Sequence, residues 1–320
     1  MATNTKAPPA NGAQKSRMTL DSITRKIEAQ PDRILLVGTE GVGKTTFAAD
    51  APSSVFICAE DGLPPVLGQV ARFPTPNSYG DVLDALRTLV KEDHEFRTVV
   101  IDTLDWLEPM VWTELCTRNS WDSIEAPGYG KGYVAATEEW RKLLSALDVL
   151  RSRKNMEVIL LAHATIKTFQ NPAGDDYSRY ECKLHKGAAA LVREWADVNL
   201  FAVHEEFVSD KKGRKKGVST GRRVIHTERT AAWDAKNRYA LPAELPLSYD
   251  EYAAAREAGL PADPAEMWEE AVGLIAELGL DEDTKTKTTE WLTRQRDRGP
   301  ARLAQAVDTL RSKVAEQGEA

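Results

Sequence analysis

The most constraining feature of the sequence is a glycine-rich segment that ends in lysine and threonine, Gly38-Thr-Glu-Gly-Val-Gly-Lys44-Thr45. It follows the apolar run 34–37 and precedes a segment that can be helical from Thr46 onward. Glycines at this spacing let main-chain N–H groups turn toward a phosphate, and a helix N-terminus favours negative charge there. The segment therefore predicts a phosphate-binding loop. The alternative is a glycine-rich strand-to-helix turn with a chance Lys-Thr pair.

The residues of this loop have separate expected roles. We expect Lys44 to contact the β- and γ-phosphates of a nucleotide and the Thr45 hydroxyl to ligate Mg²⁺. The residues predicted to surround the nucleotide are Gly38, Thr39, Glu40, Gly41, Val42, Gly43, Lys44, Thr45 and Thr46.

Short apolar runs alternate with helical patterns over the first half of the chain. Runs like that at 34–37 recur at 54–58, 98–101 and 158–161, and apolar residues recur at helical spacing over 79–90 and 135–150. Continuous apolar runs are typical of strands that are buried on both faces. The pattern predicts an α/β fold with a mostly parallel central sheet.

The second half of the chain does not continue the alternation of strands and helices. Segments 200–203 and 223–226 and the residues around Tyr239 read as antiparallel edge strands. Three amphipathic helices are expected over 266–278, 284–296 and 302–314. We therefore divide the chain into a disordered tail (1–18), an ATPase-like core (19–260) and a small helical C-terminal region (261–320).

Composition excludes several classes of protein. The 320-residue chain carries a net charge of −7, and its apolar runs fall well short of the roughly 20 residues that span a bilayer. Its three cysteines lie far apart and are expected to be reduced thiols in a cytosol. Segment 165–238 nevertheless holds fifteen Lys/Arg against ten Asp/Glu, which permits an anionic partner at one surface.

Polar residues follow three of the predicted strands. Asp102 ends the run at 98–101 and suits the metal side of a phosphoryl-transfer site, or it caps the following helix. Glu60 follows the second strand and could polarise an attacking water. Its neighbour Asp61 competes for that role, and a solvated loop carboxylate is the alternative for both. His163 ends the fourth strand, either as a buried hydrogen-bonded histidine or as a sensor of the γ-phosphate.

The order of these motifs resembles the RecA-like recombination ATPases, and most closely the phage nucleotide-binding proteins of single-strand annealing and recombination. The resemblance covers roughly residues 30–250. It rests on the phosphate loop, Ile57-Cys-Ala-Glu60, Val99-Val-Ile-Asp102 and Leu160-Leu-Ala-His163, where the family often has glutamine in place of histidine. It implies a RecA-like P-loop NTPase core, ATP and Mg²⁺ as cofactors, Glu60 as the activator of water and a cytoplasmic phage protein in its host cell.

The resemblance also implies self-assembly into a filament or ring. Lys236 and Arg238 look like the paired basic residues of the family that reach the γ-phosphate of the neighbouring subunit. The alternative is a solvated basic pair at a strand edge.

Two segments occupy positions similar to the DNA-binding loops of the family, 119–133 and 166–186. They combine cations with aromatic rings, which suits phosphates and stacked bases of single-stranded DNA. The alternative is a surface loop whose rings pack on the core. The residues expected to contact DNA are Lys131, Lys167, Phe169, Arg179, Tyr180, Lys183 and Lys186.

The cationic run 211–216 with Arg222 and Arg223 is a further candidate for DNA contact, or simply a solvated hairpin tip. These features favour an ATPase that promotes annealing or strand exchange, with a single-strand-binding protein or another recombination or replication protein as a further partner. The alternative function is a nucleotide-gated protein-interaction module, such as a helicase loader or assembly clamp, with the C-terminal helices as its docking surface.

Overall fold

The computed structural model describes residues 19–23, 30–60, 67–172, 174–211, 214–259, 264–298 and 300–318. The tail predicted for 1–18 lies outside these ranges. The strands are β1 (Arg33–Gly38), β2 (Ser54–Cys58), β3 (Ala71–Arg72), β4 (Thr98–Asp102), β5 (Glu157–Phe169), β6 (Tyr177–Cys182), β7 (Val198–Lys211), β8 (Arg214–His226) and β9 (Glu244–Pro246). The helices are η1 (Leu20–Ser22), α1 (Lys44–Ala49), α2 (Tyr79–Lys91), α3 (Leu104–Asn119), α4 (Lys131–Lys154), α5 (Lys186–Trp195), α6 (Tyr249–Ala258), α7 (Pro264–Glu277), α8 (Glu282–Asp297) and α9 (Pro300–Gly318).

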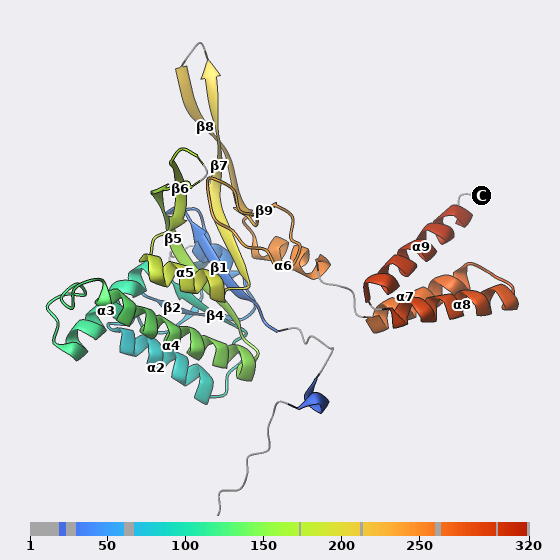
Figure 1. The fold of residues 1–320 in the computed structure, drawn as a ribbon, viewed down its shortest axis with the longest axis horizontal. Coiled ribbons are helices and arrows are strands. Elements are labelled where there is room, and N and C mark those ends of the chain that lie inside the picture. Colours follow the sequence, from blue (N-terminus) through green and yellow to red (C-terminus); the bar gives the residue numbers. More distant parts are fainter. Residues whose placement is uncertain are drawn as a thin grey trace, which may run out of the picture.

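These strands form one sheet in the order β3-β2-β4-β5-β1-β7-β8-β9 (Figure 1). Neighbours from β3 to β7 run parallel, whereas β8 and β9 are antiparallel to their neighbours and β6 is antiparallel to the outer part of β5. The predicted α/β class, with a mostly parallel sheet and antiparallel edge strands, is confirmed. The four apolar runs of the sequence are β1, β2, β4 and β5.

The central strands are buried on both faces, which explains their unbroken apolar runs. In β1, Leu35 and Val37 pack into one hydrophobic cluster while Ile34 and Leu36 pack into the other. The first cluster lies under α2, α3, α4 and α5, and the second is covered by α1 and α6. Helices on both faces leave only the strand ends open, and the carboxyl ends are where such sheets bind ligands.

The helices α7, α8 and α9 share a hydrophobic cluster of their own, which includes Met267, Leu292 and Leu310. The predicted helical C-terminal region therefore has the elements expected of it, and the domain boundary at 260/261 stays a prediction. Within the described ranges, no helix is both long and apolar enough to cross a bilayer. The three cysteines form no disulfide.

The segment around Tyr239 is not a strand, contrary to the sequence prediction; the edge strand β9 comes later. The Asn237 side-chain oxygen accepts hydrogen bonds from the backbone N–H groups of Tyr239 (3.0 Å) and Leu241 (3.1 Å). Such local side-chain bonds hold the backbone in a turn and compete with strand pairing.

A buried ion pair fixes α6 to the start of β1. Asp32 is 2% exposed and accepts two 2.7 Å hydrogen bonds from the Arg256 guanidinium and one of 3.0 Å from the Tyr252 hydroxyl. Because Arg256→Ala leaves the Asp32 carboxylate buried without its cation, we expect the free energy of unfolding to fall by about 3 kcal/mol. Denaturant titration measures this change. In the control, Arg87→Ala, an exposed ion pair with Asp84 is lost, and equal losses in both variants would contradict the expectation.

Candidate active site

The phosphate loop connects β1 to α1 and depends on glycine at defined positions. A Cβ on Gly38 would lie 2.6 Å from the Ala202 carbonyl oxygen on the neighbouring strand β7. Gly41 and Gly43 have φ of +70° and +111°, a region that other residues rarely adopt. The backbone thus turns tightly between a buried strand and a helix N-terminus, as the sequence predicts for a phosphate cradle.

Lys44, the first residue of α1, is only 5% exposed, and its ammonium lies inside the loop. Its Nζ donates hydrogen bonds to the carbonyl oxygens of Gly38 (3.2 Å) and Thr39 (3.0 Å). Burial lowers the pKa of Lys44, and the nearby Asp102 carboxylate opposes that shift. The cation is therefore held where the loop closes, in reach of a phosphate that the loop would bind.

Thr45 and Asp102 are brought together from α1 and the end of β4. The Thr45 hydroxyl donates a 2.9 Å hydrogen bond to Asp102 Oδ2. Burial raises the pKa of Asp102, whereas this hydrogen bond and the positive charge of Lys44 oppose the shift. A hydroxyl and a carboxylate are hard oxygen donors of the kind that Mg²⁺ prefers. No group of three or more potential ligands occurs among the described His, Cys, Asp and Glu residues. The site therefore fits Mg²⁺ that is completed by phosphate oxygens and water, not an all-protein cage.

Glu60 and His163 face the same space. Gly38 of β1 and His163 of β5 are partners across the parallel pairing, and Glu60 lies two residues past Cys58, the partner of Asp102. Burial raises the pKa of Glu60, whereas His163 lowers it. Asp61, the competing carboxylate of the sequence analysis, lies outside the described residues. A carboxylate with a raised pKa beside the phosphate loop suits a general base.

These side chains line one cavity of about 610 Å³ at the carboxyl edge of the sheet. Its predicted members are Glu40, Gly41, Gly43, Lys44, Thr45, Thr46, Glu60, Asp102, His163 and Lys183. Of the other predicted loop residues, Gly38 and Thr39 supply carbonyl oxygens to Lys44, while the Val42 side chain is buried in the core.

Asp105 on α3 is a site residue that the sequence analysis missed. It accepts hydrogen bonds from the His163 backbone N–H (3.0 Å) and lies 3.0 Å from His163 Nδ1. Lys183 Nζ lies 3.8 Å from the same carboxylate. Burial raises the pKa of Asp105, but the bonds to His163 outweigh it and hold the pKa at about 2. Asp105 therefore stays ionised and orients the His163 ring.

Arg223 of β8 is a second missed residue. Its Nη1 donates to the Val42 carbonyl oxygen at 3.4 Å, and a Cβ on Gly43 would lie 2.8 Å from that nitrogen. The sequence analysis placed Arg223 only in a cationic hairpin. Its position follows from the β7–β8 register, which pairs His204 with Arg223 and shifts between His204 and Glu206. No local sequence motif predicts that register. The side chains of 211–216 lie outside the described set.

Glu108 is a buried carboxylate that connects α3 to the start of α5. Both its oxygens accept the His185 backbone N–H, at 2.9 and 3.2 Å, and the residue is 5% exposed. Burial raises the pKa of Glu108 from 4.5 to about 7. The folded state therefore keeps a proton that the unfolded chain loses between these values, so the free energy of unfolding falls as pH rises through this window.

We expect Glu108→Gln to flatten this pH dependence, because glutamine cannot titrate. Between pH 4.5 and about 7, the free energy of unfolding of the wild type should fall by up to about 1.4 kcal/mol per pH unit relative to that of the variant. Denaturant titrations at pH 5, 6, 7 and 8 measure the difference. Glu92→Gln, at an exposed helix end, should follow the wild type, and a Glu108→Gln profile that does the same would contradict the assignment.

The residues predicted to contact DNA are divided by the structure. Segment 166–186 is mainly a hairpin, since β5 continues to Phe169 and pairs with β6. Lys183 lines the cavity beside the phosphate loop, Lys131 is an exposed first residue of α4, and a separate cavity is lined by Lys167, Phe169, Arg179, Tyr180 and Lys186. The Arg179 side chain is only 4% exposed, so it is not a surface contact. DNA binding by this set stays a prediction.

Lys236 and Arg238 lie at the amino end of β1, about 17 Å of strand from the phosphate loop of the same chain. Lys236 Nζ donates to the carbonyl oxygens of Glu194 (3.1 Å) and Ala196 at the end of α5. Arg238 is half-exposed and bonds to Asp197 at 3.1 Å. Neither residue lines the cavity beside the phosphate loop of its own chain, and a role toward a neighbouring subunit stays a prediction.

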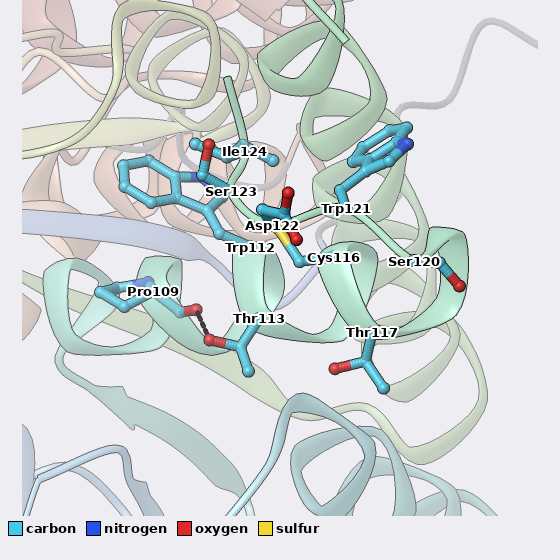
Figure 2. A pocket seen from close by; sticks show the side chains of 10 residues that line it. All are labelled: Pro109, Trp112, Thr113, Cys116, Thr117, Ser120, Trp121, Asp122, Ser123 and Ile124. Atoms are coloured by element: carbon cyan, nitrogen blue, oxygen red, sulfur yellow. Dashed lines mark hydrogen bonds between the residues drawn. The ribbon is translucent and has the colours of Figure 1, made fainter. Parts of the chain in front are cut away.

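A further hollow lies beside α3, away from the phosphate loop (Figure 2). Figure 2 shows Trp112 and Trp121 at its sides. Its lining contains one carboxylate, Asp122, and no cation, unlike the cavity beside the phosphate loop.

A glycine loop between a buried strand and a helix, with Lys44 in the loop and Thr45 against a strand-end aspartate, defines a P-loop nucleotide-binding protein. Residues 30–239 match the AAA domain family, and the chain belongs to this family. No curated protein matches the sequence. Among solved structures, the chain is similar to the RadB recombinase at 15% identity, covering 69% of this chain and 90% of that chain, with a TM-score of 0.40.

Proposed function

We propose that the protein hydrolyses ATP with Mg²⁺ in the cavity beside the phosphate loop, as a RecA-like recombination protein of phage type that acts on single-stranded DNA in the host cytoplasm. The observation that carries the ATPase proposal is the convergence of Lys44, Thr45, Asp102 and Glu60 on one cavity. Phosphoryl transfer needs these parts: a phosphate cradle, a metal ligand set and a group that activates water.

Each residue has a defined task in this reaction. Lys44 and the loop N–H groups bind the β- and γ-phosphates and stabilise the charge that develops on them. Part of the phosphate charge would be neutralised by Mg²⁺. Thr45 and Asp102 are the residues that would hold it.

Glu60 is the proposed general base. As an ionised carboxylate it accepts the proton of the attacking water, and its raised pKa brings its proton affinity nearer to the working pH. His163, held by Asp105, can donate to or accept from a phosphate or water on the cavity side. A change in that contact would reach the hairpin directly, because His163 belongs to β5.

Self-assembly is part of the proposal. Lys236 and Arg238 would complete the site of a neighbouring copy, and half-exposed Arg238 can exchange its partner Asp197 for a phosphate more readily than Lys236 can leave its carbonyl oxygens. Single-stranded DNA is the proposed polymer partner, with annealing or strand exchange as the result. A single-strand-binding protein or another replication protein would be a further partner.

ATP turnover by the full chain, measured without DNA, with single-stranded DNA and with duplex DNA, tests the DNA part of this proposal. We expect single strands to stimulate turnover more than duplex does. Turnover that no DNA changes would contradict it and favour a nucleotide-gated protein-interaction module.

A further inference from the structure

The cavity beside the phosphate loop contains a cation that the proposed hydrolysis does not use, Arg223 of β8. Its Nη1 lies 3.4 Å from the Val42 carbonyl oxygen, and a Cβ on Gly43 would meet the same nitrogen at 2.8 Å. The guanidinium therefore lies against the main chain of the loop, next to the place where the loop would bind phosphates.

The positive charge of Arg223 is not neutralised by the described part of the chain. A guanidinium carries several N–H donors, and among the described residues only the Val42 carbonyl oxygen accepts from this side chain. No described carboxylate pairs with Arg223, whereas the neighbouring Arg222 lies 3.1 Å from Glu205. Arg223 is exposed, so water can satisfy its other donors in the free protein. A phosphate in the cavity would therefore meet a cation that has no competing carboxylate.

The backbone on both sides of β8 holds Arg223 in place. Arg223 pairs with His204 of β7, and its carbonyl oxygen accepts a 3.0 Å hydrogen bond from the Leu247 N–H. The β7–β8 register shifts between His204 and Glu206, and such irregularities re-aim side chains beside active sites. A cation on a fixed strand loses less freedom on binding than one on a mobile loop.

The order of strands in the sheet indicates which phosphates Arg223 can reach. Glu60, Asp102 and His163 follow or end β2, β4 and β5, which all lie on one side of β1. The γ-phosphate has to face these residues, because the metal and the attacking water are needed there. Arg223 belongs to β8, on the other side of β1. It therefore lies toward the end of the phosphate chain that is attached to the nucleoside.

We propose that Arg223 binds the phosphates that ATP and ADP share, from within the same chain, and that it is a binding residue and not a catalytic one. The identity of the nucleotide rests on the proposed function. A contact with these phosphates has the same strength before and during hydrolysis, so it lowers KM without raising kcat. Arg223 also joins the nucleotide to the β7–β8 hairpin, because it belongs to β8.

The test is a titration of the full chain with ADP·Mg²⁺ and with a non-hydrolysable ATP analogue, in the absence of DNA. We expect Arg223→Gln to weaken the binding of both nucleotides by the same factor, about 10-fold, because glutamine has no charge. Arg222→Gln is the matched control, since consecutive residues of a strand point to opposite faces. It should match the wild type, and equal ADP affinities of the two variants would overturn the proposal.

Steady-state kinetics without DNA separate binding from catalysis. In Arg223→Gln, KM for ATP should rise by about the factor seen for ADP affinity, while kcat changes by less than about twofold. A fall in kcat with unchanged ADP affinity would place Arg223 at the γ-phosphate and overturn the proposal. Weaker binding of the ATP analogue with unchanged binding of ADP would overturn it in the same way.

A measurement on the wild type covers the case in which Arg223→Gln does not fold. Phenylglyoxal modifies accessible arginines, and mass spectrometry of the digested chain reports which ones have reacted. Arg223 and Arg222 are both exposed in the free protein. ADP·Mg²⁺ should protect Arg223 and leave Arg222 reactive, and labelling of Arg223 that ADP does not change would overturn the proposal.

The same experiments distinguish this inference from the proposed function. ADP affinity that depends on Arg223, in a chain that does not hydrolyse ATP, would remove the proposed function and preserve the inference. ATP turnover that requires Lys44, together with ADP affinity that does not depend on Arg223, would do the reverse. A wild type that binds no ADP would overturn both.

Discussion

Glu60→Gln should bind ATP·Mg²⁺ about as well as the wild type and hydrolyse it about 100- to 10,000-fold more slowly. Glutamine keeps the size and polarity of the side chain but cannot accept the proton of water. In the wild type, the rate should rise with pH through the pKa of Glu60, which burial places above 4.5. Phosphate release under saturating ATP measures the loss, and a labelled ATP analogue measures binding.

Glu95→Gln, in the exposed loop before β4, is the matched control and should retain full turnover. If Glu60→Gln turns over ATP like this control, Glu60 is not the base. Asp61, the adjacent carboxylate, would then be the next residue to change.

Lys44→Ala should remove most of the affinity for ATP and lower kcat/KM about 100- to 1000-fold. The substitution deletes the cation that lies within 3.2 Å of two loop carbonyl oxygens. The loop then has no positive charge that attracts the β- and γ-phosphates.

Lys91→Ala, at the exposed end of α2, controls for the loss of a lysine. ATP raises the unfolding temperature of any variant that binds it, by mass action. Equal ATP-induced shifts in Lys44→Ala and Lys91→Ala would contradict the role of Lys44.

The central part of the fold was predictable because its strands are buried on both faces. Runs such as 34–37 and 158–161 have no polar alternation, which is typical of a parallel sheet covered on both faces. Strand ends then place Asp102, Glu60 and His163 beside the phosphate loop. Their location at one edge of the sheet needed only strand direction, which the alternation of strands and helices supplies.

Residues positioned by tertiary register were not predictable. Asp105 reaches His163 only because β5 lies next to β4 and α3 starts directly after β4. Arg223 reaches the phosphate loop through a register shift in the β7–β8 pairing. Neither arrangement leaves a local pattern in the sequence.

The burial of Arg179 in the β5–β6 hairpin was not predictable for a different reason. Cations that alternate with rings over 166–186 suggested an exposed loop, yet alternation is also the pattern of a strand with two unlike faces. The turn residues between Phe169 and Tyr177 separate two such strands, whose pairing places Arg179 opposite Lys167 and inside a cavity. Burial of a cation depends on what covers the hairpin, and here Trp233 pairs with Tyr180 while Asp234 lies 3.9 Å from Arg179.

The most direct test of ATP hydrolysis in the cavity beside the phosphate loop is phosphate release by the purified full chain. Release is measured with ATP in the presence of Mg²⁺ or of EDTA, for the wild type, Lys44→Ala and Glu60→Gln. We expect release that requires Mg²⁺ and is lost in both variants, with ATP still bound by Glu60→Gln. Failure of the wild type to bind ATP in the presence of Mg²⁺, or release that persists in Lys44→Ala, would contradict the assignment of this site.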